Sequence, residues 1–179
     1  TDYQLDGCVR GMAHASTVLD VPVVSGNVSL YNETRRGSIY PTPIVGAVGL
    51  ISDTGLFMSP GFKDAGDLVM LLGACTIGGE SAALAGSEYI ELRHGLVVGC
   101  PVIDIDAEVA VQSLCRTLVR AGVAKSAHDC SDGGLAVALA EACIHGNMGF
   151  HGEVDVTGRW DVSLFGETPS RVVVSLPME

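Results

Sequence analysis

The chain has 179 residues, of which 47% are hydrophobic, enough apolar material to bury one sizeable core, or one core and part of a second. A formal net charge of −11 argues against a nucleic-acid-binding protein, because the average surface field repels phosphates. No apolar run approaches the roughly 20 residues that span a bilayer, and the sequence starts without a secretory signal, so we expect a cytoplasmic protein without membrane contact.

The six cysteines are widely spaced and form no CxxC pair, which excludes a zinc ribbon or a redox dithiol. We interpret them as reduced, mostly buried thiols. Three disulfides in a secreted protein are the alternative, although a chain with this much apolar material does not need them. Because the net charge is negative, any anionic ligand must be held locally, by backbone N–H groups, a helix N-terminus or a divalent cation.

The first part of the chain predicts a helix followed by two strands. Apolar residues recur at three- and four-residue intervals over 5–19, which is the spacing of an amphipathic helix. Residues 21–25 predict a short buried strand, and residues 44–52, rich in Val and Ile with interspersed Gly, predict another. The polar and charged loop between them, 26–43, is expected to be exposed.

A run of turn-forming residues at 59–66 predicts a domain boundary, with a first domain at 1–64 and a second at 65–179. The first domain would contain only a helix, two strands and a loop, too little to bury its own core. We therefore interpret the chain as a piece of a longer protein. Its uncovered apolar surface predicts self-association into a homo-oligomer.

The second domain predicts strands at 67–73, 127–130, 149–156 and 171–176, and helices at 105–121 and 134–145. The fold class is therefore α/β, with mixed α+β character. The helix at 134–145 is apolar almost all round except at Glu141, so we expect it to be buried on most of its surface.

The first candidate site is the loop Gly26-Asn27-Val28-Ser29, which directly follows the predicted strand at 21–25. Open α/β architectures place ligand groups at the carboxyl ends of strands. Gly26 lets the backbone approach a nucleotide, the Asn27 carbonyl oxygen suits magnesium, and the Ser29 hydroxyl can bond a phosphate or carbonyl. The alternative is an ordinary turn, in which Asn27 and Ser29 bond only their own backbone.

The second candidate site is the segment 126–135, where a strand ends in His128 and Asp129 before a helix that starts at a Gly pair. Backbone N–H groups there can hold an anion while Asp129 or Asp132 holds a cation. The favoured alternative is that Ser131 or Asp132 simply caps the helix and that Asp129 is a turn residue.

Three further features are weaker. Residues 86–89 predict a turn more readily than a ligand-contacting loop, and Glu167 with Arg171 predicts an ion pair of structural or surface type. Four histidines have no partner at metal-ligand spacing: His14, His94, His145 and His151. The sequence has no nucleophile elbow, phosphate-binding P-loop or HExxH zinc motif.

Taken in order, the stretches 22–34, 41–46, 86–89, 128–141 and 164–171 resemble phosphoribosylformylglycinamidine synthase, and they span nearly the whole chain. The resemblance is to the second of the family's two pseudo-symmetric halves. Each half pairs an ATP-binding-type α/β domain with a second α/β domain, as in aminoimidazole ribonucleotide synthetase. The resemblance therefore implies an aminoimidazole ribonucleotide synthetase-like fold, with 1–64 ending an ATP-binding-type domain and 65–179 forming the domain that follows it.

The resemblance also implies an ATP-dependent carbon–nitrogen ligase of purine biosynthesis. In that reaction ATP phosphorylates the amide oxygen of formylglycinamide ribonucleotide, and ammonia from a glutaminase subunit or domain displaces the phosphate to give the amidine. Carried over by motif, Gly26 contacts ATP, Asn27 binds Mg²⁺ and Ser29 contacts the substrate.

The family's catalytic histidine and acidic magnesium ligands lie in the other, N-terminal half of the enzyme, and nothing here replaces them. We therefore assign no catalytic residue to this chain, His128 included, and expect the chain alone to be inactive. The resemblance also allows Asp129 to occupy a pseudo-symmetric metal position, and it makes the turn at 164–171 structural. Two rival functions are a non-catalytic scaffold module of the same enzyme and an ATP-using relative similar to aminoimidazole ribonucleotide synthetase.

Overall fold

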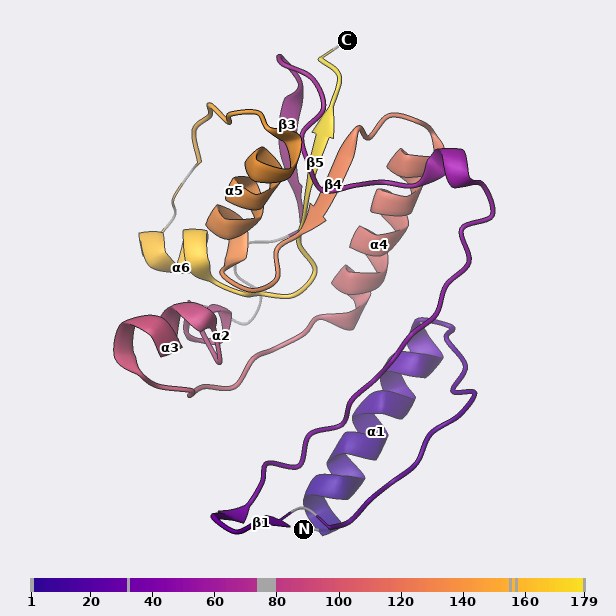
Figure 1. Ribbon diagram of the computed structural model, residues 1–179, viewed down its shortest axis with the longest axis vertical. Coiled ribbons are helices and arrows are strands. Elements are labelled where there is room, and N and C mark those ends of the chain that lie inside the picture. The colour runs from indigo at the N-terminus through magenta and orange to yellow at the C-terminus, as the bar shows by residue number, and fades with distance from the viewer. Residues whose placement is uncertain (1, 32, 74–79, 155, 157, 179) are drawn as a thin grey trace. The chain divides into compact units, whose positions relative to one another are not determined.

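A computed structural model describes residues 2–31, 33–73, 80–154, 156 and 158–178 (Figure 1). The chain divides into two compact units, Thr1–Leu50 and Ile51–Glu179. Both helices and strands occur, which confirms the mixed fold class. No helix within the described ranges is long and apolar enough to cross a bilayer. The domain boundary near residue 64 stays a prediction.

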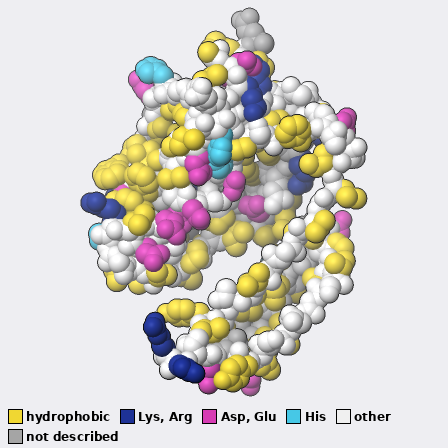
Figure 2. All heavy atoms as spheres, in the orientation of Figure 1, with side chains coloured by type: hydrophobic (Ala, Val, Ile, Leu, Met, Phe, Trp, Pro, Cys, Tyr) yellow, Lys and Arg dark blue, Asp and Glu magenta, His cyan; other side chains and the backbone are white. Residues whose placement is uncertain are grey.

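The first unit consists of one helix and a small hairpin. Helix α1, Asp2–Val18, confirms the helix predicted at 5–19, and none of its residues is buried. Strands β1, Glu33–Thr34, and β2, Gly37–Ser38, pair antiparallel inside the loop predicted to be exposed. Hydrophobic side chains lie on the surface of this unit (Figure 2), and Val24 and Ile44 are 91% and 96% exposed.

The strands predicted at 21–25 and 44–52 are wrong, because both segments lack regular secondary structure. Their Val and Ile content is typical of strands, but a strand forms only when a neighbour pairs with its backbone and covers its side chains. Neither segment pairs with a strand in the described part of the chain. The apolar side chains therefore remain in solvent.

The second unit is built on a three-stranded antiparallel sheet in the order β3-β5-β4. These strands are β3, Leu68–Leu72, β4, Ser126–Asp129, and β5, Val172–Leu176. They confirm the strands predicted at 67–73, 127–130 and 171–176. The strand predicted at 149–156 is wrong, since residues 149–154 and 156 are not in a strand.

Two long helices pack on this sheet. Helix α4, Ile105–Arg120, begins at Asp104, whose carboxylate accepts the N–H groups of Asp106 and Ala107. Helix α5, Gly134–Gly146, ends at Asn147, which adopts the left-handed conformation common at helix C-termini. Both helices confirm the predictions at 105–121 and 134–145.

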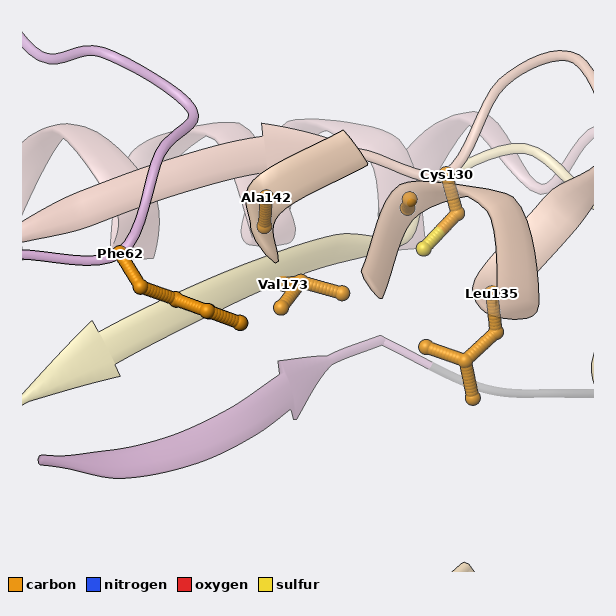
Figure 3. Packing of buried hydrophobic residues seen from close by; sticks show 6 residues of the cluster. Phe62, Cys130, Leu135, Ala142 and Val173 are labelled. Atoms are coloured by element: carbon orange, nitrogen blue, oxygen red, sulfur yellow. The ribbon is translucent and has the colours of Figure 1, made fainter. Parts of the chain in front are cut away.

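The two helices cover opposite faces of the sheet, because successive residues of β5 point to opposite sides. Val173 packs with Leu135 and Ala142 of α5 (Figure 3), whereas Val174 packs with Val111 of α4. The central strand is therefore buried on both faces.

Helix α5 is covered on several sides, in line with the expectation that most of its surface is buried. Ala138 and Ala142 face the sheet at 2% and 0% exposure, Gly134 contacts the backbone at 164–166, and Gly146 contacts the backbone of Phe62. One strip of the helix faces solvent, where Ile144 is 75% exposed.

Four short elements complete the described part of the second unit. They are a 3₁₀ turn at Thr54–Leu56 and the helices α2, Glu80–Ala83, α3, Glu88–His94, and α6, Trp160–Phe165. The turn expected at 86–89 thus leads directly into α3, with Ser87 as the N-cap residue. All three helices are too short for an apolar period to mark them clearly in the sequence.

Candidate functional site

The loop Gly26-Asn27-Val28-Ser29 lies in the first unit as exposed chain without regular structure. A Cβ added to Gly26 meets no atom within 4 Å, so the backbone there is open to a ligand. The side chains of Asn27 and Ser29 make no hydrogen bond to any other described residue. The described residues therefore do not form the alternative, a turn in which Asn27 and Ser29 bond their own backbone.

The assignment of the loop at 26–29 as a ligand site stays a prediction. The carbonyl oxygen of Asn27 fits Mg²⁺ as one hard oxygen ligand. A magnesium ion needs about six such ligands, so water, phosphate oxygens or other side chains must supply the rest. No group of three or more His, Cys, Asp and Glu side chains that could hold a metal occurs among the described residues.

The second predicted segment connects β4 to α5 and holds a chain of polar contacts. The ring of His128 lies between two carboxylates, with Nε2 3.1 Å from Oε2 of Glu141 and Nδ1 3.5 Å from Oδ1 of Asp129. The hydroxyl of Ser131 donates to Asp129. This hydrogen bond, together with His128 nearby, lowers the pKa of Asp129 below its ordinary value.

Neither Ser131 nor Asp132 caps α5, which corrects the favoured reading of this segment. The N-cap position is Gly133, with a φ of +78° and no capping side chain of its own. The hydroxyl of Ser131 points instead to Asp129, and only its backbone carbonyl serves the helix, by accepting the N–H of Gly134. The start of the helix is therefore served by a side chain from elsewhere.

That side chain is Glu167. Its Oε1 accepts the N–H of Gly133 at 2.7 Å and the N–H of Glu88 at 2.9 Å. Its own N–H donates to the carbonyl of Ala83 at 2.8 Å. One residue thus joins the end of α2, the first residue of α3 and the start of α5, and its negative charge faces the positive end of α5.

Arg171 holds the turn that carries Glu167. The residue is 2% exposed, and its guanidinium donates to the carbonyls of Thr168 and Gly166. No ion pair between Glu167 and Arg171 exists in the described structure, so the predicted pair is wrong. The hydroxyls of Thr168 and Ser170 and the Nη1 of Arg171 are buried and have no hydrogen-bond partner among the described residues. The turn is structural, as expected, and it fixes the position of one carboxylate.

The role of Glu167 escaped the sequence reasoning for a physical reason. Its two N–H partners lie 34 and 79 residues away along the chain, and a backbone donor carries no side-chain signature. No local signal was available, because Ser131 and Asp132 beside the Gly pair at 133–134 are themselves suitable cap residues. Only the folded structure shows that a distant acceptor takes the N–H of Gly133.

Comparison with known proteins defines the class to which this arrangement belongs. A family model described as AIR synthase related protein, C-terminal domain, matches residues 64–179. The chain belongs to this family. The match includes the sheet, α4, α5 and the Glu167 turn.

Particular relatives carry a more specific name. The phosphoribosylformylglycinamidine synthase subunit PurL of Thermomicrobium roseum is 48% identical over 179 residues, covering 97% of this chain and 24% of the relative. PurL of Anaeromyxobacter sp. is 47% identical over 188 residues, covering 99% and 24%. A solved structure described as T. maritima PurL complexed with ATP has a TM-score of 0.47 and 16% identity, over 70% of this chain and 20% of that one.

The family model and the two PurL sequences confirm the family resemblance drawn from the sequence motifs. The chain spans about a quarter of the length of the curated relatives that it matches.

Proposed function

We propose that this chain forms part of an ATP-dependent synthetase that converts formylglycinamide ribonucleotide to formylglycinamidine ribonucleotide. ATP and glutamine-derived ammonia are consumed, ADP and phosphate are released, and the reaction belongs to purine biosynthesis in the cytoplasm. The observation that carries the proposal is the 48% identity, over nearly the whole chain, to a relative named phosphoribosylformylglycinamidine synthase subunit PurL.

In this proposal the loop at 26–29 forms one wall of the active site. Gly26 admits ATP close to the backbone, Asn27 supplies an oxygen ligand to Mg²⁺, and Ser29 bonds the substrate. Mg²⁺, when bound, neutralises phosphate charge that develops during phosphoryl transfer. The exposed, unpaired side chains of Asn27 and Ser29 support this role, because no described internal contact competes for them.

The proposal includes partners that complete the reaction. The catalytic base and the acidic magnesium ligands come from the N-terminal half of the same enzyme, and a glutaminase subunit or domain supplies ammonia. The chain by itself is therefore inactive. The exposed apolar side chains of the first unit favour self-association when that half is absent, which light scattering on the isolated chain tests; a strictly monomeric chain contradicts this point.

The deciding experiment assays the full-length protein that contains this chain, with formylglycinamide ribonucleotide, ATP and ammonia. Formation of the amidine together with ADP supports the proposal. Absence of that product, together with ATP-dependent turnover when formylglycinamidine ribonucleotide is supplied as the substrate in a parallel assay, identifies a relative of aminoimidazole ribonucleotide synthetase. If the full enzyme is active and substitutions in the loop at 26–29 leave every kinetic constant unchanged, the chain is a scaffold module.

The residue assignment has its own test. Loss of an outer-shell partner of a metal ligand typically costs roughly 10–100-fold in metal affinity or activity, so loss of a direct ligand costs at least about tenfold. We expect Asn27→Ala in the full enzyme to raise the Mg²⁺ concentration at half-maximal rate by that factor. Asn27→Asp, which keeps an oxygen at the same position, is the matched control and loses less. Unaltered magnesium dependence in Asn27→Ala removes Asn27 from the site.

A further inference from the structure

The hairpin of β1 and β2 in the first unit carries two adjacent arginines at its tip. Thr34 of β1 pairs with Gly37 of β2, so Arg35 and Arg36 form the turn between the two strands. The hydroxyl of Thr34 accepts the N–H of Arg36 at 3.1 Å and donates to the carbonyl oxygen of Gly37 at 3.1 Å. The turn is thereby closed from within, and both arginines are exposed on it, beside the label β1 in Figure 1. We name residues 35 and 36 the arginine turn.

The arginine turn holds the only Lys or Arg side chains of the first unit that have no acidic partner in the described part of the chain. Residues 1–50 contain three such side chains, and Arg10 is the third. The Nε of Arg10 lies 2.8 Å from Oδ2 of Asp6, whereas Arg35 and Arg36 form no ion pair with a described residue. A guanidinium presents five N–H donors in a planar fork that matches a phosphate group. The arginine turn therefore offers two unused cations of the kind that binds phosphate.

The needs of the hairpin alone do not explain two arginines at this turn. Tight turns favour Gly, Pro, Asn, Asp and Ser, each for a conformational reason that arginine does not share. Exposed charges also protect short hairpins from pairing with other chains, but lysine serves that purpose equally well. A ligand that requires the guanidinium fork accounts for arginine in particular.

The arginine turn is close in sequence to the loop that we propose binds ATP and the substrate. Six positions separate Ser29 from Arg35, and both belong to the compact unit 1–50. The arginine turn therefore lies within about 25 Å of Ser29, whatever path the chain between them takes. Only four of the 21 acidic residues lie in residues 1–50, so this unit carries little of the negative charge that repels phosphates.

We propose that Arg35 and Arg36 bind a phosphate group of a ligand held at the loop 26–29. The inference rests on the proposed function and adds two binding residues to it. Gly26, Asn27 and Ser29 are uncharged, so they leave the charge of a bound phosphate to Mg²⁺ and to cations nearby. ATP and formylglycinamide ribonucleotide both carry phosphate, and the arginine turn supplies the chemistry that recognises either one.

Steady-state kinetics and equilibrium binding on the full-length protein that contains this chain test the arginine turn. We expect the double variant Arg35→Ala with Arg36→Ala to raise the KM and the dissociation constant of one ligand by about tenfold or more, because it removes hydrogen bonds to a charged group. The kcat should change less, and the affinity should depend less on salt concentration than in the wild type. A rise for ATP alone assigns the nucleotide's phosphates to the turn, and a rise for formylglycinamide ribonucleotide alone assigns the phosphate of the substrate.

Arg10→Ala is the matched control, because it removes an exposed arginine of the same unit that already has a partner in Asp6. It should leave the KM and the dissociation constant of both ligands unchanged. Replacing both arginines of the turn by lysine keeps the charge but loses the planar fork, so the affinity should lie between those of the wild type and of the alanine variant. This lysine variant also decides the matter if the alanine variant does not fold, and wild-type affinity in it then overturns the inference.

The outcomes separate this inference from the proposed function. If the wild type binds both ligands and the alanine variant binds them equally well, the arginine turn is not a binding element and the proposed function stands. An equal loss of affinity in Arg10→Ala also overturns the inference, since the effect then follows net charge rather than the turn. If the wild type binds neither ligand, the proposed function fails and this inference fails with it.

Discussion

Replacing Gly134 by alanine tests the close approach between the start of α5 and the end of α6. Gly134 has a φ of +67°, and a Cβ built on it lies 2.5 Å from the carbonyl oxygen of Gly166 and 3.0 Å from the carbonyl carbon of Phe165. Both atoms belong to the backbone, so neither can rotate away. The left-handed conformation costs an alanine about 1–2 kcal/mol, and forcing packed segments apart typically costs about 1–3 kcal/mol more. We expect Gly134→Ala to lower the free energy of unfolding by about 2–5 kcal/mol.

Gly122 provides a control with the same backbone conformation. Its φ is also +67°, but a Cβ built there meets no heavy atom within 4 Å. Gly122→Ala should therefore lose only the conformational part, about 1–2 kcal/mol. The difference between the two variants isolates the cost of the contact with Gly166.

Urea unfolding of the complete chain measures both variants, with far-UV circular dichroism and tryptophan fluorescence as probes. The chain has a single tryptophan, Trp160, which lies in α6 close to the altered contact. Equal destabilisation by the two substitutions refutes the reasoning, because it means that α5 and α6 do not approach as closely as described. Noncoincident transitions by the two probes in Gly134→Ala indicate separate opening of α6.

Three further predictions concern buried and charged pairs. The hydroxyls of Ser126 and Ser175 lie 2.7 Å apart in the buried sheet, so each single substitution by alanine should cost about 1–3 kcal/mol, and the double variant less than the sum in a double-mutant cycle. The hydrogen bond to Asp67 raises the pKa of Lys125. This pair therefore stabilises the fold below the ordinary lysine pKa, and the stabilisation is lost as pH rises through the higher pKa of the folded state. Lys125→Met should flatten the alkaline part of the curve of unfolding free energy against pH. The hydrogen bond from Ser131 lowers the pKa of Asp129. It therefore stabilises the fold above the ordinary aspartate pKa, and this stabilisation is lost as pH falls through the lower pKa of the folded state. Ser131→Ala should weaken the dependence of stability on acid pH, and an unchanged dependence contradicts the Ser131 contact.

Much of the second unit follows from sequence because its signals are local. The continuous apolar runs of β3 and β5 and the capped, periodic segment of α4 each carry their pattern within a few residues. In the folded unit, the apolar faces of these segments are the faces that pack against one another. Propensity and tertiary packing agree there, so the predictions are confirmed.

In the first unit, local composition predicts strands that do not form. Residues 21–25 and 44–52 have the composition of buried strands, yet Val48 is 97% exposed and neither segment pairs with a described strand. The composition of a segment shows that its side chains are suited to burial. Whether they are buried depends on a partner surface elsewhere in the fold, which the local sequence does not specify.

For the candidate sites, the sequence by itself determined the family, through the order of its motifs, and with it the expectation for Gly26, Asn27 and Ser29. Only the tertiary structure decided what serves the start of α5: Glu167 accepts the N–H of Gly133, 34 positions away, while the nearby Ser131 donates to Asp129. A local cap depends on the chemistry of a few adjacent residues. A distant cap depends on how α6 and the turn after it pack against α5, and that packing is a property of the whole second unit.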